Sequence, residues 1–389
     1  MESTVYLKRD RAKTMMAFGH PWVFSQGIKS KPETDTGSVV RVCSEDGNVL
    51  GWGLYHARNS IAVRMIQFGE SALSDDWLLE ALKSAFKIRQ KAFVDLPEAY
   101  RLVHGENDHL PGLTIDVFGE TAVIQITAAG MDQQRPAIIE ALRTLGFTRL
   151  YERSDSTARQ QEGLTLSQGP LSGNPKFPIV INDSGIKYQI NPTKDQKTGF
   201  FLDQREGRAF VAARTFTSVL DLFCNTGGFS LAALSGHCPR VLAIDSSADA
   251  LDRLQQHVLH NGFDPSHVET QRQDLFRWLE SRVRETFELV VLDPPSLAKH
   301  RNATNQALKA YRKLNAAAGR RVQPGGLLLT FCCSGLIPKD RFHQSVFLGL
   351  RDVGRSGRIV AHFHPGPDHP EHLNFLEGHY FKGMAVHLD

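Results

Sequence analysis

The segment Val219–Phe229 constrains the fold more than any other part of the chain. It reads VLDLFCNTGGF, an apolar run with an acid near its end, then a short polar turn, two glycines and another apolar residue. This order predicts a buried strand, a tight loop and the start of a helix. Because Gly227 and Gly228 carry no side chain where that helix begins, a ligand can lie against the loop backbone. The segment therefore indicates an α/β fold that binds a ligand at this loop.

Acids follow the expected strands beyond this loop. Asp245 closes the apolar run 240–244, about 20 residues past the glycines, where a carboxylate can accept hydrogen bonds from two ribose hydroxyls. Asp274 follows an expected helix, 250–260, and a short third strand, and a loop carboxylate there can accept from the exocyclic amine of an adenine. Asp293 ends a further apolar strand and precedes two prolines that stiffen the turn.

A glycine loop by itself is weak support, because many α/β proteins begin a helix with one. A dinucleotide site is disfavoured, since the loop lacks a third spaced glycine and a phosphate-binding Lys-Ser/Thr ending. The ordered set of acids instead resembles the nucleotide site of class I S-adenosylmethionine-dependent methyltransferases. That resemblance implies that the methyl donor contacts Asp221, Phe223, Asn225, Thr226, Gly227, Gly228, Asp245, Ser246, Asp274, Leu275 and Asp293.

Length and composition limit the class of protein. A chain of 389 residues suits two or three domains. It has no apolar run long enough to cross a bilayer and no secretory signal pattern at its start. We therefore expect a soluble, cytoplasmic protein that does not bind a membrane. The net charge of +3 excludes no nucleic-acid partner, because local basic patches decide such binding.

Cysteines and histidines give no metal or disulfide pattern. The five cysteines are odd in number and include no Cys-x-x-Cys pair, which argues against a disulfide framework and against zinc. Four histidines fall in the Pro/Gly-rich segment 362–372, without a recognisable ligand set around them. We expect this segment to be a solvated or substrate-facing loop, and we expect no metal.

Three domains are expected along the chain. Residues 1–73 predict a small β-rich unit, with strands at 38–42 and 61–66 and a hairpin turn at 46–48. Residues 74–183 predict a compact α+β unit. Its expected elements are a helix at 74–91, strands at 113–118 and 122–126, a helix at 136–145, a strand at 149–153 and then a polar loop. A hairpin at 179–191 leads into the strand–helix alternation of residues 184–389.

Two features bear on the group that is methylated. Enzymes that methylate an exocyclic base amine usually present an aromatic side chain after Asp-Pro-Pro to stack on a flipped base, but this chain has Ser296 there. A second apolar strand, 327–333, ends in Cys332 and Cys333. Such cysteines are often small apolar fillers. At this edge of a parallel sheet a cysteine can also be a nucleophile.

A cysteine nucleophile fits methylation of a pyrimidine at C5. This carbon is too electron-poor to attack a methyl sulfonium, but a thiolate added at C6 makes it nucleophilic. An acid beside the ring assists by hydrogen bonding at N3 and the amino group of cytosine. Asp293 is the candidate for that acid, because its strand should neighbour the cysteine, and the role requires it to share or hold a proton.

With these features the chain resembles the ribosomal RNA large-subunit methyltransferase I family of cytosine-C5 methyltransferases. The motifs that carry the resemblance cover nearly the whole chain: GHPWVFS at 19–25, KTGFFLDQR at 197–205, NTGGF at 225–229, LDPP at 292–295 and FCCSGL at 331–336. The resemblance implies an N-terminal PUA domain that binds RNA, for which we expect contacts from Lys8, Arg11 and Trp22. Phosphate contacts should make that binding depend on salt.

The same resemblance assigns roles at the catalytic site. The nucleophile falls on Cys333, with Cys332 at a position that the family often fills with serine. Lys197, Asp203, Gln204 and Arg205 are implied to flank the donor, and Arg205 suits the methionine carboxylate through its bidentate guanidinium. The alternative is that Asp203 and Arg205 pair with each other.

The sequence thus predicts an S-adenosylmethionine-dependent enzyme that forms 5-methylcytosine in large-subunit ribosomal RNA through a covalent cysteine–C6 intermediate. A second interpretation keeps the donor but methylates a ring nitrogen of guanine without covalent catalysis. A third is a non-catalytic RNA-binding assembly factor that keeps a donor site only for structure. The oligomeric state stays open, with a homodimer as one alternative.

Overall fold

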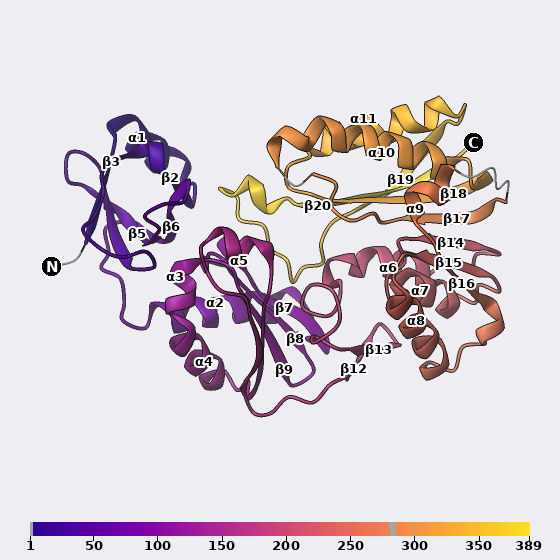
Figure 1. Cartoon of the computed structure of the whole chain (residues 1–389), viewed down its shortest axis with the longest axis horizontal. Helices are drawn as coiled ribbons and strands as arrows, with labels where there is room; N and C mark the ends of the chain where they lie inside the picture. Colours follow the sequence, from indigo (N-terminus) through magenta and orange to yellow (C-terminus); the bar gives the residue numbers. More distant parts are fainter. Residues whose placement is uncertain (1–2, 281–284, 299) are drawn as a thin grey trace. The chain divides into compact units, whose positions relative to one another are not determined.

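The computed structural model of the protein describes residues 3–280, 285–298 and 300–389 (Figure 1). The chain folds into two compact units. Unit 1 comprises Met1–Ile181, Gln189–Phe200 and Pro367–Gly378, and unit 2 comprises Asn182–Tyr188, Phe201–Gly366 and His379–Asp389. The units therefore share the chain in alternating segments. The expected three-domain division at 73/74 and 183/184 stays a proposal.

Unit 1 begins with a sheet whose described strands follow the order β2-β6-β5-β4-β1-β3. The predicted strands and the hairpin turn are present, and Gly47 in that turn adopts a left-handed φ of 89°. Buried and half-buried residues alternate along β1 and most of β4, whereas β5 is buried along nearly its whole length, and these strands share a core with helix α1 (Arg9–Phe18). The strands are β1 (Thr4–Leu7), β2 (Trp22–Phe24), β3 (Ile28–Ser30), β4 (Val39–Cys43), β5 (Val49–Tyr55) and β6 (Ile61–Phe68).

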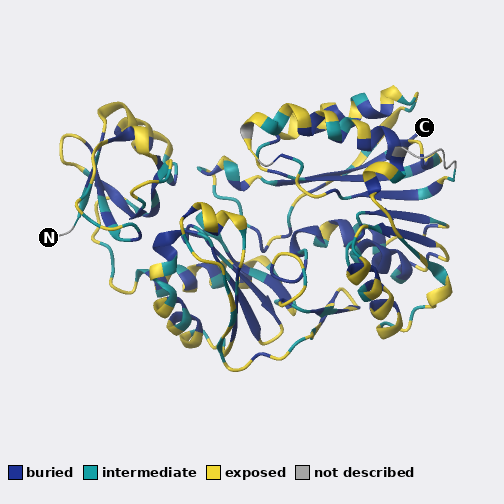
Figure 2. Ribbon diagram, in the orientation of Figure 1, coloured by how far each residue is buried: buried dark blue, intermediate teal, exposed yellow. Residues whose placement is uncertain are grey.

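The second sheet of unit 1 has the described order β11-β10-β9-β8-β7, and its middle strands are buried on both faces (Figure 2). Its strands are β7 (Ala99–His104), β8 (Leu113–Phe118), β9 (Thr121–Ile126), β10 (Arg149–Ser154) and β11 (Ser167–Ser172). Its helices are α2 (Trp77–Ala92), α3 (Ala129–Gln133), α4 (Arg135–Thr144) and α5 (Thr157–Gln161). A separate hairpin pairs β12 (Ile179–Asp183) with β13 (Ile186–Ile190).

The prediction of a polar loop after residue 153 was wrong, because α5 and β11 lie there. Helix α5 is anchored by the buried Arg159, whose Nη1 donates to the carbonyl of Ile126 at 3.1 Å and to Asp132 Oδ1 at 2.9 Å. A buried arginine leaves no apolar periodicity in the sequence. Strand β11 is a partly exposed edge strand containing glycine and proline, so it also lacks the apolar alternation of an ordinary strand.

Unit 2 contains a sheet with the described order β16-β15-β14-β17-β18-β20-β19. β14 pairs in parallel with both β15 and β17, whereas β20 pairs antiparallel with both β18 and β19. Strand order thus reverses at β14, which creates a switch point where α/β proteins bind ligands. The strands are β14 (Val219–Leu222), β15 (Val241–Asp245), β16 (Val268–Arg272), β17 (Phe287–Leu292), β18 (Val322–Cys333), β19 (Gly357–Phe363) and β20 (Phe381–Leu388).

Helices cover both faces of this sheet (Figure 1). α10 (Thr304–Gly319) and α11 (Lys339–Asp352) pack on the face that presents Leu220, Val290 and Leu328. The other face meets α6 (Arg205–Ala212), α7 (Gly228–Ser235) and α8 (Ala248–His260), and here the Phe229 and Phe331 rings stack with centroids 5.3 Å apart. A shorter helix, α9 (Leu275–Glu280), lies against α10. The predicted α/β class is confirmed. Among the described helices, none combines the length and apolar character needed to cross a membrane.

Candidate active site at the switch point

The loop after β14 has an unusual backbone conformation. Phe223, Asn225 and Gly227 all adopt positive φ, at 62°, 47° and 83°. Left-handed conformations are costly for most residues, and asparagine and glycine are the usual exceptions. A Cβ on Gly227 would lie 2.1 Å from Leu254 Cδ1, so another residue fits there only if the Leu254 side chain shifts. The tight strand–loop–helix predicted from the sequence is present.

Asp245 at the end of β15 fixes this loop. Its Oδ2 accepts from the backbone N–H of Asn225 at 2.9 Å, and its Oδ1 accepts from the N–H of Ser247 at 2.9 Å. Asn225 Oδ1 in turn accepts from the N–H of Thr226 at 2.8 Å. A carboxylate has about four acceptor positions, so each Asp245 oxygen keeps one for a ligand donor. The partly exposed Asp245 and its exposed neighbour Ser246 can therefore meet a ribose at this edge.

Asp221 lies beneath the loop in the interior of the sheet. It is 1 % exposed, and its Oδ2 accepts from the backbone N–H of Ser230 at 3.0 Å and from Ser230 Oγ at 2.7 Å. Burial raises the pKa of Asp221 to about 6, although the hydrogen bonds from Ser230 oppose that rise. The geometry joins α7 to β14 through this side chain. No role for Ser230 was expected from the sequence.

Asp274 and Leu275 differ in environment although they are adjacent. Asp274 is exposed at the start of α9, where its Oδ1 accepts from the N–H of Phe276 at 3.0 Å. The Leu275 side chain is buried in the core of unit 2. Sequence reasoning missed Phe276, whose half-exposed ring meets the Phe223 ring edge to face with centroids 5.9 Å apart. These two rings provide an aromatic wall that joins the loop after β14 to the start of α9.

Asp293 and Cys333 meet at the ends of the neighbouring strands β17 and β18. Cys333 Sγ lies 4.0 Å from Asp293 Oδ1. The other carboxylate oxygen, Oδ2, accepts from Gln204 Nε2 at 2.7 Å. Both Asp293 and Cys333 are partly exposed, whereas Gln204 is buried. The structure thus brings together the two residues that the sequence proposed for catalysis.

The two adjacent cysteines point to different environments. Cys332 is 0 % exposed and packs in the core with residues of α10 and α11, and burial raises the pKa of its thiol. Cys333 is partly exposed. Side chains alternate across a strand, so only one of two neighbours can face a given side of the sheet. Of this pair, Cys333 is the one with access to a ligand.

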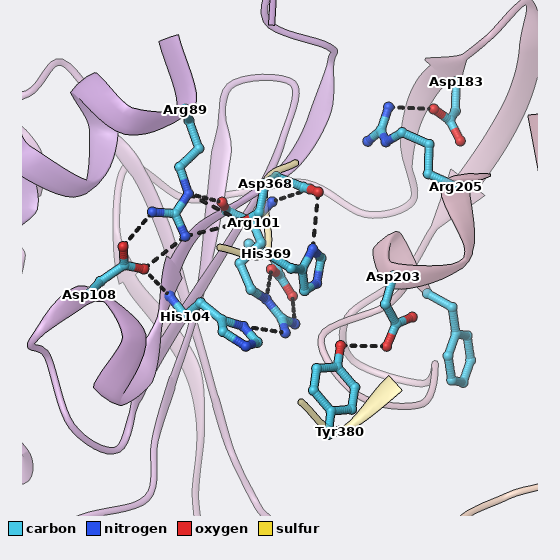
Figure 3. Close-up of polar contacts among 12 residues, drawn as sticks. Arg89, Arg101, His104, Asp108, Asp183, Asp203, Arg205, Asp368, His369 and Tyr380 are labelled. Carbon is cyan, nitrogen blue, oxygen red and sulfur yellow. Dashed lines mark hydrogen bonds and ion pairs between the residues drawn. The ribbon is translucent and has the colours of Figure 1, made fainter. Parts of the chain in front are cut away.

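Asp203 and Arg205 each contact a residue other than the other member of the pair. Tyr380 OH donates to Asp203 Oδ2 at 2.8 Å, and Arg205 Nη1 donates to Asp183 Oδ1 at 2.7 Å (Figure 3). Asp183 also accepts from Arg208 Nη2 at 2.6 Å. Asp183, Arg208 and Tyr380 were not expected from the sequence, because their contacts join residues far apart in the chain.

In unit 1, the three side chains expected to bind RNA lie in different surroundings. Lys8 and Arg11 are exposed at the start of α1. Trp22 is partly buried, and its Nε1 donates to Glu106 Oε1 at 2.8 Å. Arg11 and Trp22 line one groove of unit 1, with a volume of about 470 Å³, and Lys8 is not among its lining residues.

The Pro/His-rich segment is partly buried. We call residues Pro367–Gly378, which belong to unit 1, the strap segment. Its Asp368 and His369 are 0 % and 4 % exposed, so the expectation of a solvated loop is wrong at these positions. Asp368 Oδ1 lies 3.0 Å from His369 Nδ1 (Figure 3). Within the described residues, no three His, Cys, Asp or Glu side chains gather closely enough to hold a metal ion.

Comparison with solved structures supports the fold. A crystal structure of a protein complexed with SAH aligns over the whole of both chains with a TM-score of 0.85 at 21 % identity. A tRNA m1G37 methyltransferase from M. jannaschii aligns with a TM-score of 0.52 at 14 % identity, over 87 % of this chain and 91 % of the other. At these identities the likeness is one of fold.

Comparison of sequences identifies the domains and the family. Residues 162–346 match a family described as S-adenosylmethionine-dependent methyltransferase, and residues 5–68 match a PUA-like domain. S-adenosylmethionine is therefore the cofactor.

Relatives named "Ribosomal RNA large subunit methyltransferase I" match along the chain. One from Alteromonas mediterranea is 35 % identical over all of this chain and 99 % of its own length. One from Escherichia coli is 36 % identical over the full length of both. One from Shewanella denitrificans is 38 % identical over 95 % of each. The chain belongs to the ribosomal RNA large subunit methyltransferase I family.

Proposed function

We propose that the protein methylates C5 of a cytosine in large-subunit ribosomal RNA, with Cys333 as the nucleophile. The name of its full-length relatives supports the RNA class. The choice of cytosine and of its C5 atom rests on the approach of Cys333 Sγ to Asp293 Oδ1. These atoms lie 4.0 Å apart, at the edge of the sheet where the loop after β14 also lies. A thiol beside a carboxyl group at a switch point suits covalent activation of a pyrimidine.

The proposed chemistry begins when the Cys333 thiolate adds to C6 of the cytosine. The Sγ–C6 bond forms while the C5=C6 π electrons form a C4=C5 double bond and the C4=N3 π electrons pass to N3, which takes a proton from Asp293. C5 is then enamine-like and takes the methyl group, and the electron pair of the broken methyl–sulfonium bond stays on the donor sulfur. The C5 proton passes to a base, its electron pair restores C5=C6, and Sγ leaves as thiolate. N3 returns its proton to Asp293, so the enzyme is regenerated.

Asp293 is well placed for this role because its two oxygens have different partners. Gln204 holds Oδ2, while Oδ1 faces the thiol. One oxygen can therefore stay oriented while the other exchanges a proton or hydrogen bond with the base. The partial exposure of Asp293 and Cys333 leaves room for a substrate ring to approach both.

The donor site in this proposal is the loop after β14 with its neighbouring strand ends. The free acceptor positions of Asp245 suit the ribose, the exposed Asp274 suits the adenine amine, and the Phe223–Phe276 wall suits the flat adenine ring. Arg205 keeps its proposed role toward the methionine carboxylate, with Asp183 orienting its guanidinium. Asp221 acts through Ser230 and α7. When bound, the donor supplies an electrophilic methyl group.

The experiment that tests the reaction is nucleoside mass spectrometry of unmethylated ribosomal RNA incubated with the protein and S-adenosylmethionine. A gain of 5-methylcytidine is the expected result. A methylated guanosine would favour the second interpretation and remove the role of Cys333. No product despite donor binding, on an RNA that a relative methylates, would favour the assembly factor.

A mechanism-based trap tests the covalent step separately. RNA carrying 5-fluorocytidine at the target cannot lose a C5 proton, so a protein–RNA adduct should accumulate with S-adenosylmethionine present. We expect the adduct with the parent and with Cys332→Ala, and none with Cys333→Ala. The proposed substrate is ribosomal RNA in the cytoplasm. Whether the protein acts as a homodimer stays an open question.

A further inference from the structure

The sheet of unit 2 places a second proton-carrying side chain next to the strand that ends in Cys333. In that sheet β18 lies between β17 and β20. Asp293 follows β17, and Tyr380 immediately precedes β20. Because β20 runs antiparallel to β18 and Phe381 pairs with Cys333, the start of β20 lies at the same edge as the end of β18. Cys333 therefore stands between Asp293 and Tyr380 along this edge.

The start of β20 is held firmly in this position. Lys382 Nζ donates to the carbonyl of Ser334 at 2.7 Å and also to the carbonyl of Ile337. Lys382 is 6 % exposed, so these charge-assisted hydrogen bonds are shielded from water. The ring of Phe381 meets the ring of Phe331 with centroids 5.8 Å apart. The turn after the nucleophile and the start of β20 are therefore fixed against each other.

The short turn Leu202–Gln204, which precedes α6, contacts both neighbours of the cysteine. Gln204 Nε2 donates to Asp293 Oδ2 at 2.7 Å. The adjacent Asp203 accepts at Oδ2 from Tyr380 OH at 2.8 Å (Figure 3). Asp203 and Gln204 are 2 % and 3 % exposed. Two consecutive buried side chains thus orient the carboxyl group on one side of the nucleophile and the phenol on the other.

This turn approaches the strand edge from the face that Cys333 shares. Alternate residues of a strand lie on one face, so Cys333 lies on the face of Phe331, and Cys332 lies on the opposite one. Phe331 stacks on Phe229 of α7, and a Cβ on Gly207 of α6 would lie 3.1 Å from the Phe331 ring. Helices α6 and α7 therefore cover this face, and the turn that leads into α6 ends beside the thiol.

The contact between Tyr380 and Asp203 has the form of a proton relay. The phenol is partly exposed, whereas the carboxylate is buried behind it. A phenol oxygen that donates its hydrogen to a carboxylate still has lone pairs with which to accept. It can take a proton from a substrate while its own proton passes to the carboxylate, which makes it a stronger base than an isolated phenol.

The proposed reaction needs such a base at its last chemical step. After methyl transfer the C5 proton must leave, while Asp293 is engaged with the proton on N3 and must later take that proton back. A second acceptor is therefore required. Tyr380 lies on the side of Cys333 away from β14 and the donor loop, so it does not occupy the place of the methyl donor.

We infer that Tyr380 accepts the C5 proton and that Asp203 takes the phenolic proton in the same step. The C5–H bond breaks and its electron pair restores C5=C6, while the Sγ–C6 bond breaks and its electrons stay on Cys333 as thiolate. Tyr380 then gives a proton to water and takes back the one held by Asp203, so both groups are regenerated. This inference rests on the covalent reaction proposed above and assigns the base that it leaves open.

The test is the yield of covalent protein–RNA adduct on ordinary cytidine RNA. Unmethylated large-subunit ribosomal RNA is incubated with Tyr380→Phe and methyl-labelled S-adenosylmethionine, and adducts are separated on denaturing gels. The variant keeps the ring but cannot accept the proton, so the methyl group should transfer and the adduct should then persist. We expect the methyl-labelled adduct to exceed that of the parent at least tenfold, and release of methylated RNA to slow roughly 100-fold, as for a lost general base.

Two further variants frame this result. Asp203→Asn keeps the size of the side chain but cannot take a proton, so it should also accumulate the methyl-labelled adduct. Calorimetric titration of Asp203→Asn with S-adenosylmethionine should show donor affinity close to that of the parent. Tyr6→Phe is the matched control, because Tyr6 is a half-buried tyrosine on β1 in unit 1. It should release methylated RNA as the parent does.

A purely structural role would give a different result. If Tyr380 only held the turn before α6, Tyr380→Phe would form less adduct with both cytidine and 5-fluorocytidine RNA, and that outcome would overturn the inference. Release of methylated RNA at the parent rate would overturn it too. In both cases a 5-fluorocytidine adduct of the parent would leave the proposed function standing. A parent that forms no such adduct would instead remove the covalent mechanism, and the inference with it.

Discussion

Gln204 donates a hydrogen bond of 2.7 Å to Asp293 across the edge of the unit 2 sheet. Gln204 ends the short turn Leu202–Gln204 before α6, and Asp293 follows β17. The amide is 3 % exposed, so water does not compete for the contact. Because Oδ2 is held in this way, Oδ1 stays directed at Cys333. Gln204 is thus a positioning residue for the proposed acid.

Replacing Gln204 should therefore affect the chemical step more than substrate binding. For Gln204→Ala we expect kcat to fall roughly 10- to 100-fold, as for other lost supporting contacts, with little change in the KM for either substrate. Single-turnover kinetics with methyl-labelled donor measures this. A matching loss in KM with kcat intact would mean that Gln204 contacts a substrate. Gln196→Ala, in the preceding loop, is a suitable amide control.

The two adjacent cysteines should differ in reactivity. Cys332 is buried with a raised thiol pKa, whereas Cys333 is partly exposed. Since the thiolate is the reactive form and needs access, iodoacetamide should label Cys333 first at about pH 8. Peptide mass spectrometry after brief labelling gives the order. Methyl-transfer activity should be lost in step with the labelling of Cys333. Preferential labelling of Cys332 would contradict the assigned nucleophile.

Local patterns predicted much of the fold. The apolar strands and the glycine loop indicated the α/β sheet and its switch point, since the strand ends at Asp245 and Asp293 follow from short-range sequence. The contact of Arg89 with Asp368 was out of reach, because it joins residues 279 positions apart through polar groups that have no periodicity. Residues 362–372, which overlap the strap segment, were accordingly expected to form a solvated or substrate-facing loop.

The candidate site was also predictable only in part. The residue types and their strands were available from the sequence, but the partners of each side chain were not. Asp221 illustrates this, because its position in the loop motif favours a ligand contact, whereas its register within β14 turns the carboxylate toward Ser230. Alternation could separate Cys332 from Cys333 only once the facing helices α10 and α11 were placed.

The buried Asp221 should make stability depend on pH. Its folded pKa, raised to about 6 by burial, exceeds the ordinary value of 3.8, so the folded state holds its proton more tightly than the unfolded state. The stabilising contribution is complete below pH 3.8 and is lost as the pH rises through 6. Asp221→Asn removes this ionisation, so its stability relative to the parent should improve between about pH 4.5 and pH 7.5 by on the order of 1–3 kcal/mol. Urea unfolding at both pH values measures this change, and no change would mean that Asp221 titrates normally.

Gly227 should tolerate no side chain. In Gly227→Ala the new Cβ would meet Leu254 at 2.1 Å in addition to the strain of a φ of 83°. We expect donor affinity to fall at least tenfold, because either the loop or the Leu254 side chain beneath it must shift, and stability to fall by about 1–3 kcal/mol. Gly262→Ala is the matched control, since Gly262 has a similar φ of 71° but open space around its Cβ position. Donor affinity, measured by calorimetry, should be unchanged in that control. If both variants lost donor affinity equally, the loss would come from backbone strain alone and not from the contact with Leu254.

Asp245 offers the most direct test of the donor site. Its Oδ1 accepts from the N–H two residues later, and Asp264 makes the same local contact with the N–H of Ser266, also at 2.9 Å. The two side chains thus share a turn, but only Asp245 reaches the glycine loop, through Asn225. Asp245→Ala should weaken S-adenosylmethionine binding by about 1–3 kcal/mol, the usual cost of losing charge-assisted hydrogen bonds, whereas Asp264→Ala should leave it unchanged. Titration calorimetry of both variants compares them directly. Full donor affinity in Asp245→Ala would remove this residue from the ribose role and leave it as a support for the loop.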